Sequence, residues 1–334
     1  MATLNDVAIR AGVSKATASR ALNHPALVAP ATAERVRVAA RELDFVPNRL
    51  ARQLALGRTG IVSMLFPTLS NAFFTPIIAG AQDRAEELGL YLTVTAQPLA
   101  AAAELSHLAD LARQVDGFVV VAPRGDDALV TRAMALRPSV LVDREIDGHT
   151  SVVADTASAF AALMRGLAAA GHRRVVFIGG PDRSWQNVQR TRAIEHAART
   201  GGVDITVLGP AEPNFLVGQS LAQEVRASGA TAVLPYAADL GLGVLFELVR
   251  SGHSTLGPAS SSPGLIEVVG VPDSPAVAVD GHALGREALD RLHERLAEDP
   301  HGSPPASTQQ RLPVPISQAG PHPTHSPSPA HSPG

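Results

Sequence analysis

The chain has 334 residues, 45% hydrophobic and 18% charged, which is enough for two or three packed units. It has no cysteine, which excludes disulfides, thiolate metal sites and cysteine nucleophiles. The net charge of −3 is uneven: residues 1–60 carry nine basic and four acidic residues (+5), and the remainder carries 19 and 27 (−8). A basic N-terminal segment suits contact with nucleic-acid phosphates, although a solvated surface with uneven charge is the alternative.

The sequence shows no export or membrane signal. The N-terminus lacks a basic stretch followed by an apolar run, so we expect no signal peptide. No stretch of 18 or more apolar residues occurs, so we expect no membrane span. Because the chain also lacks disulfides, these features favour a cytoplasmic protein.

Residues 1–46 are predicted to form three short helices. Thr3 is a candidate N-cap of the first helix, and Ser14 is a candidate N-cap of the second, after a turn at Gly12. Pro30 suits the start of the third helix, where its missing N–H costs nothing. Two helices joined by a tight glycine-containing turn are typical of a helix-turn-helix unit, which places its second helix in the DNA major groove.

The helix after Ser14 has two faces of different chemistry. Ala18, Ala21 and Leu22 are small or apolar and can pack on the first helix. The opposite face offers donors for guanine, a methyl group for thymine and hydroxyls for phosphates. Its residues are Lys15, Ala16, Ser19 and Arg20. A three-helix bundle with a polar outer face is also a common structural unit, so this pattern leaves a purely structural role open.

Pro47 interrupts the helical pattern and separates the headpiece from the rest of the chain. Residues 48–56 could add one or two helical turns, which Gly57 would end. A helix this short is marginal by itself in water. Residues 47–59 are therefore interpreted as a hinge helix or linker.

From Gly60 onward, short apolar runs alternate with longer alanine-rich amphipathic stretches. This alternation predicts an α/β fold with parallel sheets covered on both faces. About eight strands exceed the usual number for one such sheet, so residues 60–319 are expected to form two lobes. The predicted strands cover residues 61–66, 90–95, 118–121, 140–142, 175–178, 205–208, 232–234 and 268–271, and predicted helices include residues 77–88, 157–170 and 221–228.

The end of the chain is rich in proline. Residues 312–316 could form a final edge strand, because their prolines exclude them from the middle of a sheet. The Pro/Ser/His-rich composition of residues 320–334 predicts a disordered tail. Its histidines could bind metal, but a solvated tail is the better interpretation. We expect no metal site and no cofactor.

The headpiece resembles that of the lac repressor–gal repressor (LacI/GalR) family. Residues 3–8 (TLNDVA), 11–23 (AGVSKATASRALN) and 41–48 (RELDFVPN) carry the resemblance. It implies a three-helix helix-turn-helix headpiece, a hinge helix and a two-lobed α/β sensor domain like a periplasmic binding protein. Ala18 departs from the family, which usually has a β-branched residue at this packing position.

The resemblance assigns DNA-binding roles. Lys15, Ala16 and Arg20 match the family's base-reading positions, and residues 50–54 match its hinge helix. In the family this helix wedges a leucine into the central base step, and Leu54 occupies that place here; the alternative is a core leucine on an amphipathic helix. The expected DNA-binding residues are Ser14, Lys15, Ala16, Thr17, Ser19, Arg20, Asn48, Ala51 and Leu54.

The body also resembles the family's effector-binding domain. Residues 70–74 match a loop after its first strand, Arg190 matches an effector-binding arginine, and Asp239 stands near a helix start that contacts effector. Arginine donors and carboxylate acceptors suit a hydroxyl-rich ligand, a sugar or nucleoside-like molecule. The rings of Phe73 and Phe74 could stack on such a ligand or belong to the core. Trp185 is a further candidate for stacking. The expected effector-binding residues are Asn71, Phe73, Phe74, Asp143, Arg190 and Asp239.

The chain departs from the family around this cleft. Ala238 replaces the usual asparagine before Asp239, Thr156 replaces the asparagine of an Asp-Asn pair, and Ala159 replaces a later glycine. The segment between Pro275 and Ala276 is shorter than usual.

Two other classes share this fold. The sequence has no G-x-G-x-x-G after a strand, no phosphate-binding loop, no G-x-S-x-G elbow and no H-E-x-x-H, so we expect no enzyme. A solute-binding protein of a transport system would need export and has no use for the first 60 residues. We therefore expect a DNA-binding transcriptional regulator, a repressor, that binds a palindromic operator as a homodimer under control of a small-molecule effector.

Overall fold

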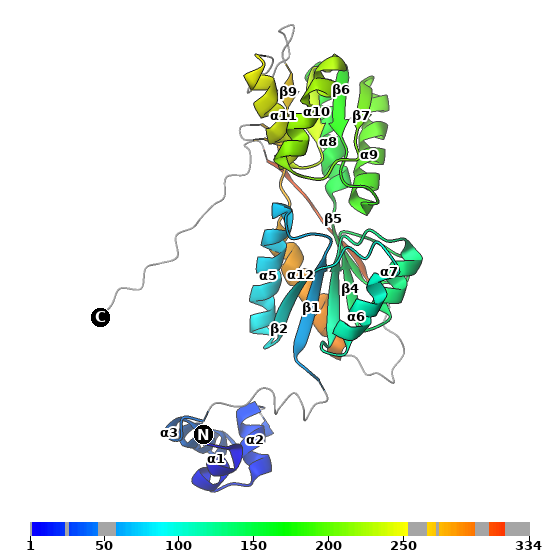
Figure 1. Ribbon diagram of the computed structural model, residues 1–334. Helices are drawn as coiled ribbons and strands as arrows, with labels where there is room; N and C mark the ends of the chain where they lie inside the picture. The colour runs from blue at the N-terminus through cyan, green and yellow to red at the C-terminus, as the bar shows by residue number, and fades with distance from the viewer. Residues whose placement is uncertain are drawn as a thin grey trace, which may run out of the picture. The chain divides into compact units, whose positions relative to one another are not determined.

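The computed structural model describes residues 2–23, 27–45, 58–252, 266–271, 274–297 and 307–317. The chain divides into two compact units, Met1–Thr59 and Gly60–Gly334 (Figure 1). The expected hinge residues Asn48, Ala51 and Leu54, and the tail over residues 320–334, lie outside the described residues. In the described part of the chain, no helix is long and apolar enough to cross a membrane.

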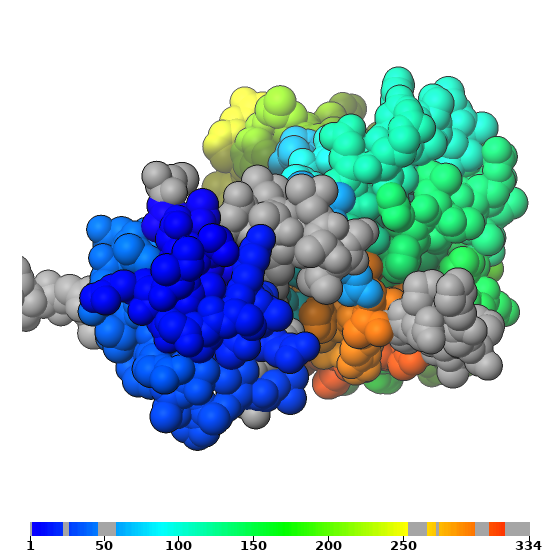
Figure 2. All heavy atoms as spheres, turned by 90° about the horizontal axis from the view of Figure 1, so that it is seen from below, coloured from blue at the N-terminus to red at the C-terminus, as the bar shows by residue number. Residues whose placement is uncertain are grey.

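The described residues of the headpiece form three helices around a core of small side chains, and their atoms form a continuous body in Figure 2. Alanines and valines fill this core, with Val7, Ala18 and Val36 fully buried. Small side chains allow short helices to pack closely. The helices are α1 (Leu4–Ala11), α2 (Lys15–Asn23) and α3 (Pro30–Glu42).

Local capping contacts fix where these helices begin. The Thr3 Oγ1 accepts from the Asp6 N–H at 3.4 Å, and the Asp6 carboxylate accepts from the Thr3 N–H at 2.8 Å. These hydrogen bonds to Thr3 lower the pKa of Asp6. The Ser14 Oγ accepts from the Thr17 N–H at 3.1 Å, and Pro30 occupies the first position of α3. The three predicted helices and their caps are confirmed.

The first lobe of the body, the N-lobe, is built on a parallel sheet with the strand order β11-β5-β4-β3-β1-β2. Helices α5 and α12 cover one face, and α6 and α7 cover the other (Figure 1). The strands are β1 (Ile61–Phe66), β2 (Tyr91–Ala96), β3 (Gly117–Val121), β4 (Ser139–Val142), β5 (Ser151–Ala154) and β11 (Gln309–Leu312). The helices are the 3-10 turn η2 (Ala72–Phe74), α5 (Thr75–Glu87), α6 (Glu104–Ala112), α7 (Asp127–Met134) and α12 (Gly281–Ala297).

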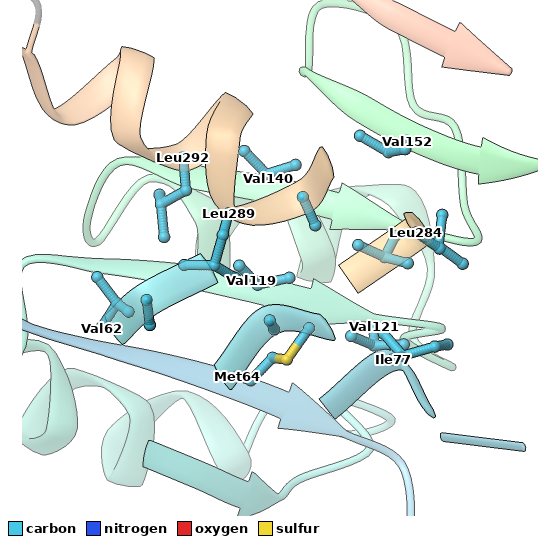
Figure 3. Close-up of a cluster of buried hydrophobic side chains, with 14 of the residues drawn as sticks. Val62, Met64, Ile77, Val119, Val121, Val140, Val152, Leu284, Leu289 and Leu292 are labelled. Atoms are coloured by element: carbon cyan, nitrogen blue, oxygen red, sulfur yellow. The ribbon is translucent and has the colours of Figure 1, made fainter. Parts of the chain in front are cut away.

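Burial on both faces explains why these strands are apolar at nearly every position. Met64 points to the face under α5 and α12, and its neighbour Leu65 points to the opposite core. In Figure 3, Leu289 and Leu292 of α12 lie over Val119 and Val140 of the sheet. The predicted parallel α/β arrangement with covered faces is confirmed.

The second lobe, the C-lobe, repeats this architecture with the strand order β7-β6-β8-β9, all parallel. Helices α8 and α9 pack on one face, and α10 and α11 pack on the other. The strands are β6 (Arg174–Ile178), β7 (Asp204–Leu208), β8 (Ala232–Pro235) and β9 (Glu267–Val268). The helices are α8 (Thr156–Ala169), α9 (Trp185–Gly201), α10 (Phe215–Ala227) and α11 (Ala238–Arg250).

Within the described residues, the chain passes between the lobes at three places. The first passage joins β5 to α8 through Asp155. The second runs from Val277, which packs on the C-lobe core, to Val279, which packs on the N-lobe core. The third runs from Val314 back to Ile316. The last two passages pair antiparallel, as β10 (Ala276–Val277) and β12 (Ile316–Ser317).

Three elements predicted from the sequence have a boundary that is wrong by more than two residues. The final edge strand is β11, which ends at Leu312, because the prolines after it cannot continue its ladder. The strand expected over residues 268–271 ends at Val268, where the chain turns through Gly270 with φ 80°. The helix expected over residues 221–228 begins at Phe215, because the Asn214 side chain caps it.

Glycines let two helix pairs approach at backbone distance. A Cβ on Gly80 of α5 would lie 2.0 Å from the His282 carbonyl oxygen of α12, and one on Gly218 of α10 would lie 2.2 Å from the Leu240 carbonyl oxygen of α11. Both contacts are with main-chain atoms, which cannot move without shifting the helix. Side chains larger than hydrogen are therefore excluded at these crossings.

We expect Gly80→Ala to destabilise the body by about 1–3 kcal/mol, because α5 and α12 must separate to admit the methyl group. Chemical denaturation measures this change. Gly166→Ala in α8 is the matched control, since apart from the neighbouring backbone of its own helix no described atom lies within 4 Å of the added Cβ. It should stabilise the helix by roughly 0.5–1 kcal/mol. Equal effects of the two substitutions would contradict the close-packing interpretation.

Candidate functional site

The outer face of α2 presents the residues expected to contact DNA. Lys15, Ala16 and Arg20 are exposed, whereas Ala18 and Ala21 are 0% and 2% exposed against the other helices. Ser14 is exposed, and Thr17 and Ser19 are half-buried. The predicted separation into a packing face and an outer face is therefore confirmed.

Two glutamates of the headpiece pair with cations away from the outer face of α2. Glu42 pairs with Arg10 at 2.7 Å, and Glu34 pairs with Arg37 at 2.5 Å and with Arg41 at 3.2 Å. Among the described residues, no carboxylate pairs with Lys15 or Arg20. These two cations are thus available to an anionic partner.

A cavity of about 290 Å³ lies between the two lobes of the body. It is bounded by the segments that come after the carboxyl ends of the strands, including residues after β1, β3 and β4 in the N-lobe and after β6, β7 and β8 in the C-lobe. In each sheet the order reverses beside the first strand, between β1 and β3 and between β6 and β8. Parallel sheets of this order bind ligands at this switch point.

The structure brings all the residues expected to bind effector to this one cavity. Phe74 is 5% exposed and its ring lies 5.1 Å from that of Phe66, so it belongs to the N-lobe core as well. Trp185 is half-buried and is not among the lining residues. The expected residues that line the cavity are Asn71, Phe73, Phe74, Asp143, Arg190 and Asp239.

Arg190 of α9 is held inside the cavity wall by aromatic and polar partners. Its guanidinium carbon lies 4.8 Å from the Phe160 ring centre and 4.3 Å from that of Tyr236. The Nε donates to the Thr156 Oγ1 at 2.8 Å, and Nη1 donates to the Tyr236 carbonyl oxygen at 3.0 Å. Among the described residues, Nη2 has no such partner, so this donor remains for a ligand.

A chain of buried hydrogen bonds extends from Arg190 to the N-lobe. The Thr156 Oγ1 donates to the Gln186 Oε1 at 2.9 Å. The Gln186 Nε2 donates to the Asp143 Oδ1 at 2.9 Å and to the Ala154 carbonyl oxygen at 3.2 Å. Gln186 belongs to the C-lobe and Asp143 to the N-lobe, so the chain joins the two lobes beneath the cavity.

Asp143 is constrained in both conformation and charge. Its φ is 55°, which is unusual for a residue other than glycine and is typical of sites held by their surroundings. Burial raises the pKa of its carboxyl, and the hydrogen bond from Gln186 and the charge of Arg190 oppose that change. A carboxyl in this state can accept from a ligand hydroxyl or, when protonated, donate to it.

Several lining residues were not predicted from the sequence, among them Arg124, Phe160, Gln186, Glu212 and Tyr236. Thr156 was not predicted either; it supports the wall through hydrogen bonds to Arg190 and Gln186. Arg124, Glu212 and Tyr236 come after predicted strands, and the rule that ligands meet the carboxyl ends of parallel strands would have suggested them. Thr156 was noted only as a departure from the family. In the structure its hydroxyl connects Arg190 to Gln186, a role that only a side chain with both donor and acceptor can fill.

Each of the two parts of the chain matches the model of a known protein family. Residues 3–48 match the model of bacterial regulatory proteins of the lacI family. Residues 59–304 match the model of periplasmic binding proteins and the sugar-binding domain of the LacI family. The chain belongs to the LacI family. It is a transcriptional regulator with a DNA-binding headpiece and an effector domain, and not an enzyme.

Individual relatives of this LacI-family chain span almost its full length. The ribose operon repressor of Bacillus subtilis (strain 168) is 28% identical, over 94% of this chain and 96% of its own. A crystal structure of the lac repressor dimer bound to operator and the anti-inducer ONPF has a TM-score of 0.77 at 24% identity, covering 95% and 98%. The complex of transcriptional regulator CelR with cellobiose has a TM-score of 0.65 at 24% identity, covering 96% and 100%.

Proposed function

We propose that this regulator is a repressor in which α2 reads the operator. The observation that supports this assignment is the exposed face of Lys15, Ala16 and Arg20, whose cations have no carboxylate partner among the described residues. Arginine and lysine donate to guanine O6 and N7, and alanine contacts a thymine methyl. Ser14, Thr17 and Ser19 lie beside them at the start and flank of the helix, where hydroxyls reach phosphates.

The hinge residues complete the proposed DNA interface. Asn48, Ala51 and Leu54 lie outside the described residues, and their roles rest on the sequence resemblance alone. Leu54 would wedge into the central base step and kink the duplex, which allows more contacts. Because its target is double-stranded operator DNA, the protein would act in the cytoplasm.

The effector we propose is a small hydroxyl-rich molecule, a sugar or nucleoside, bound in the cavity between the lobes. Arg190 would donate through Nη2, and Asp143 and Asp239 would accept from hydroxyls. Asn71, Phe73 and Phe74 would contact the ligand from the N-lobe. A ligand bound by both lobes changes the balance between their open and closed arrangements, so its affinity and that for DNA are coupled reciprocally.

The surface of α10 and α11 suits contact with a second copy of this chain. Phe215, Leu216, Phe246 and Val249 are 39%, 72%, 50% and 55% exposed, and the two phenylalanine rings lie 5.6 Å apart. Large exposed apolar side chains gathered on two adjacent helices are typical of an interface. A dimer with two headpieces would read a palindromic operator.

We expect Arg20→Ala to weaken binding to the operator by roughly 1–3 kcal/mol per half-site, and to relax base preference at one position of each half-site. Selection from a random DNA pool first gives the operator, and titrations at fixed salt then compare it with random duplex. Arg37→Ala is the matched control, because Arg37 pairs with Glu34 on α3. Equal losses on operator and random DNA would contradict base reading by Arg20.

We expect Arg190→Ala to abolish the response to effector and leave operator affinity intact, because the side chain faces the cavity. A panel of sugars and nucleosides is first tested for a rise in melting temperature, and the active compound is then added to the operator complex. Arg192→Ala, an exposed position on the same helix, is the control. Parallel loss of ligand response and DNA binding would indicate a folding role for Arg190.

We expect Phe246→Asp to convert the dimer to monomers, since a carboxylate would be buried at the interface without a partner. Sedimentation velocity measures the oligomeric state. Val188→Asp on α9, where Val188 is 42% exposed, is the control and should leave the dimer intact. A Phe246→Asp variant that remains dimeric would exclude this surface.

A further inference from the structure

A second contact between the lobes lies at the rim of the cavity. Arg124 comes after β3 in the N-lobe, and Glu212 precedes α10 in the C-lobe. The Arg124 Nη1 donates to the Glu212 Oε1 at 2.7 Å, and Nη2 donates to Oε2 at 2.9 Å. Both residues line the cavity, and their side chains are 22% and 51% exposed. The pair is therefore a bidentate ion pair at the boundary between cavity and solvent.

The N-lobe holds the Arg124 segment firmly in place. The buried Arg144 donates through Nη1 to the carbonyl oxygens of Pro123 at 2.8 Å and Gly125 at 2.7 Å. The Arg124 N–H donates to the Pro98 carbonyl oxygen at 2.9 Å. The backbone on both sides of Arg124 is thus fixed to one lobe, and only its side chain reaches the other.

The C-lobe holds Glu212 in a comparable way. The Ala211 N–H donates to the Gly180 carbonyl oxygen at 3.1 Å, and the Asn214 N–H donates to the Glu212 carbonyl oxygen at 2.9 Å. Asn214 in turn caps α10 through the Val217 N–H at 2.9 Å. Each ion therefore moves with its own lobe, and their separation reports how far the lobes are apart.

The two inter-lobe contacts differ in how close they lie to the chain segments that pass between the lobes. Gln186 bonds to the Ala154 carbonyl oxygen, next to the passage from β5 to α8. Arg124 and Glu212 lie on segments that do not continue into any of the described passages. Rotation of one lobe about those passages breaks a bidentate contact, whose two hydrogen bonds both require distances near 3 Å.

We propose that Arg124 and Glu212 form an ion-pair clasp that stabilises the closed cleft before ligand binds, so that effector entry and release require it to open. The clasp deepens the proposed function, since it rests on the cavity being the effector site. Both ions contact solvent, so salt screens their attraction and the gain is modest. Removing either charge should raise the ratio of open to closed protein roughly twofold to fivefold.

The chain has no cysteine, so spin labels attach only to cysteines that are introduced by substitution. His107→Cys on α6 and His196→Cys on α9 replace exposed residues, one in each lobe and neither on the proposed dimer surface of α10 and α11. Labelled protomers are mixed with an excess of unlabelled ones, so that each dimer carries one labelled pair at most. Double electron–electron resonance then gives the distribution of distances between the lobes without ligand.

Four variants are compared in this labelled background. Arg124→Gln and Glu212→Gln each remove one charge, and the double variant Arg124→Glu with Glu212→Arg exchanges the charges. Arg113→Gln is the matched control, because it breaks the ion pair of Arg113 with Asp110 inside the N-lobe. Salt of about 1 M, where the Debye length is about 3 Å, tests screening.

We expect each single variant to increase the long-distance population roughly twofold to fivefold, and the exchanged pair to return it toward the parent value. The control should match the parent, and high salt should shift the parent toward the single variants. Distributions that are unchanged in both single variants, or changed in only one of them, would overturn the clasp.

The measurement separates the clasp from the proposed effector function. The distances are recorded without ligand, so they test the clasp whether or not an effector is found. Failure of every sugar and nucleoside to bind, with variant-dependent distances as expected, would reject the proposed effector class and leave the clasp. Binding of a sugar or nucleoside, with inter-lobe distances unchanged in the variants, would support the proposed effector class and reject the clasp.

Discussion

Arg190 carries a charge into the wall of the cavity, where only 6% of the residue is exposed, and the surrounding site is arranged to make this burial tolerable. Two aromatic rings lie against the guanidinium, and the Thr156 Oγ1 and the Tyr236 carbonyl oxygen accept hydrogen bonds from it. Thr156 then orients Gln186, which reaches Asp143 in the other lobe. The partners that hold this buried cation all belong to the C-lobe, and the hydrogen bonds that continue from Thr156 through Gln186 reach the N-lobe.

The contacts between the lobes differ in their dependence on solvent. The hydrogen-bond chain through Gln186 is buried, so neither salt nor water competes strongly with it. The Arg124–Glu212 pair meets solvent and is screened. The Gln186 hydrogen bonds hold the lobes together beside a chain passage, and the Arg124–Glu212 pair adjusts how readily the cleft opens. A ligand that touches both lobes acts on the balance between these arrangements.

Local chemistry determined much of the headpiece and can be read directly from the sequence. Thr3 and Ser14 cap helices through contacts within four residues, and Pro30 occupies the first position of α3. Ala18 and Ala21 mark the packing face of α2. Apolar runs likewise predicted most strands of the body. Strand ends were less certain, since the end of β9 depends on a turn at Gly270 that apolar character does not reveal.

The sequence by itself determined the class of protein, the two-part organisation and the residues that resemble the family's motifs. The tertiary structure alone decided how these residues act together, because the decisive contacts join distant positions. Gln186 and Asp143 are 43 residues apart, and Arg124 and Glu212 are 88 apart. No local pattern encodes such pairs: they exist only because two separately folded parallel sheets bring their strand ends to opposite sides of one cavity.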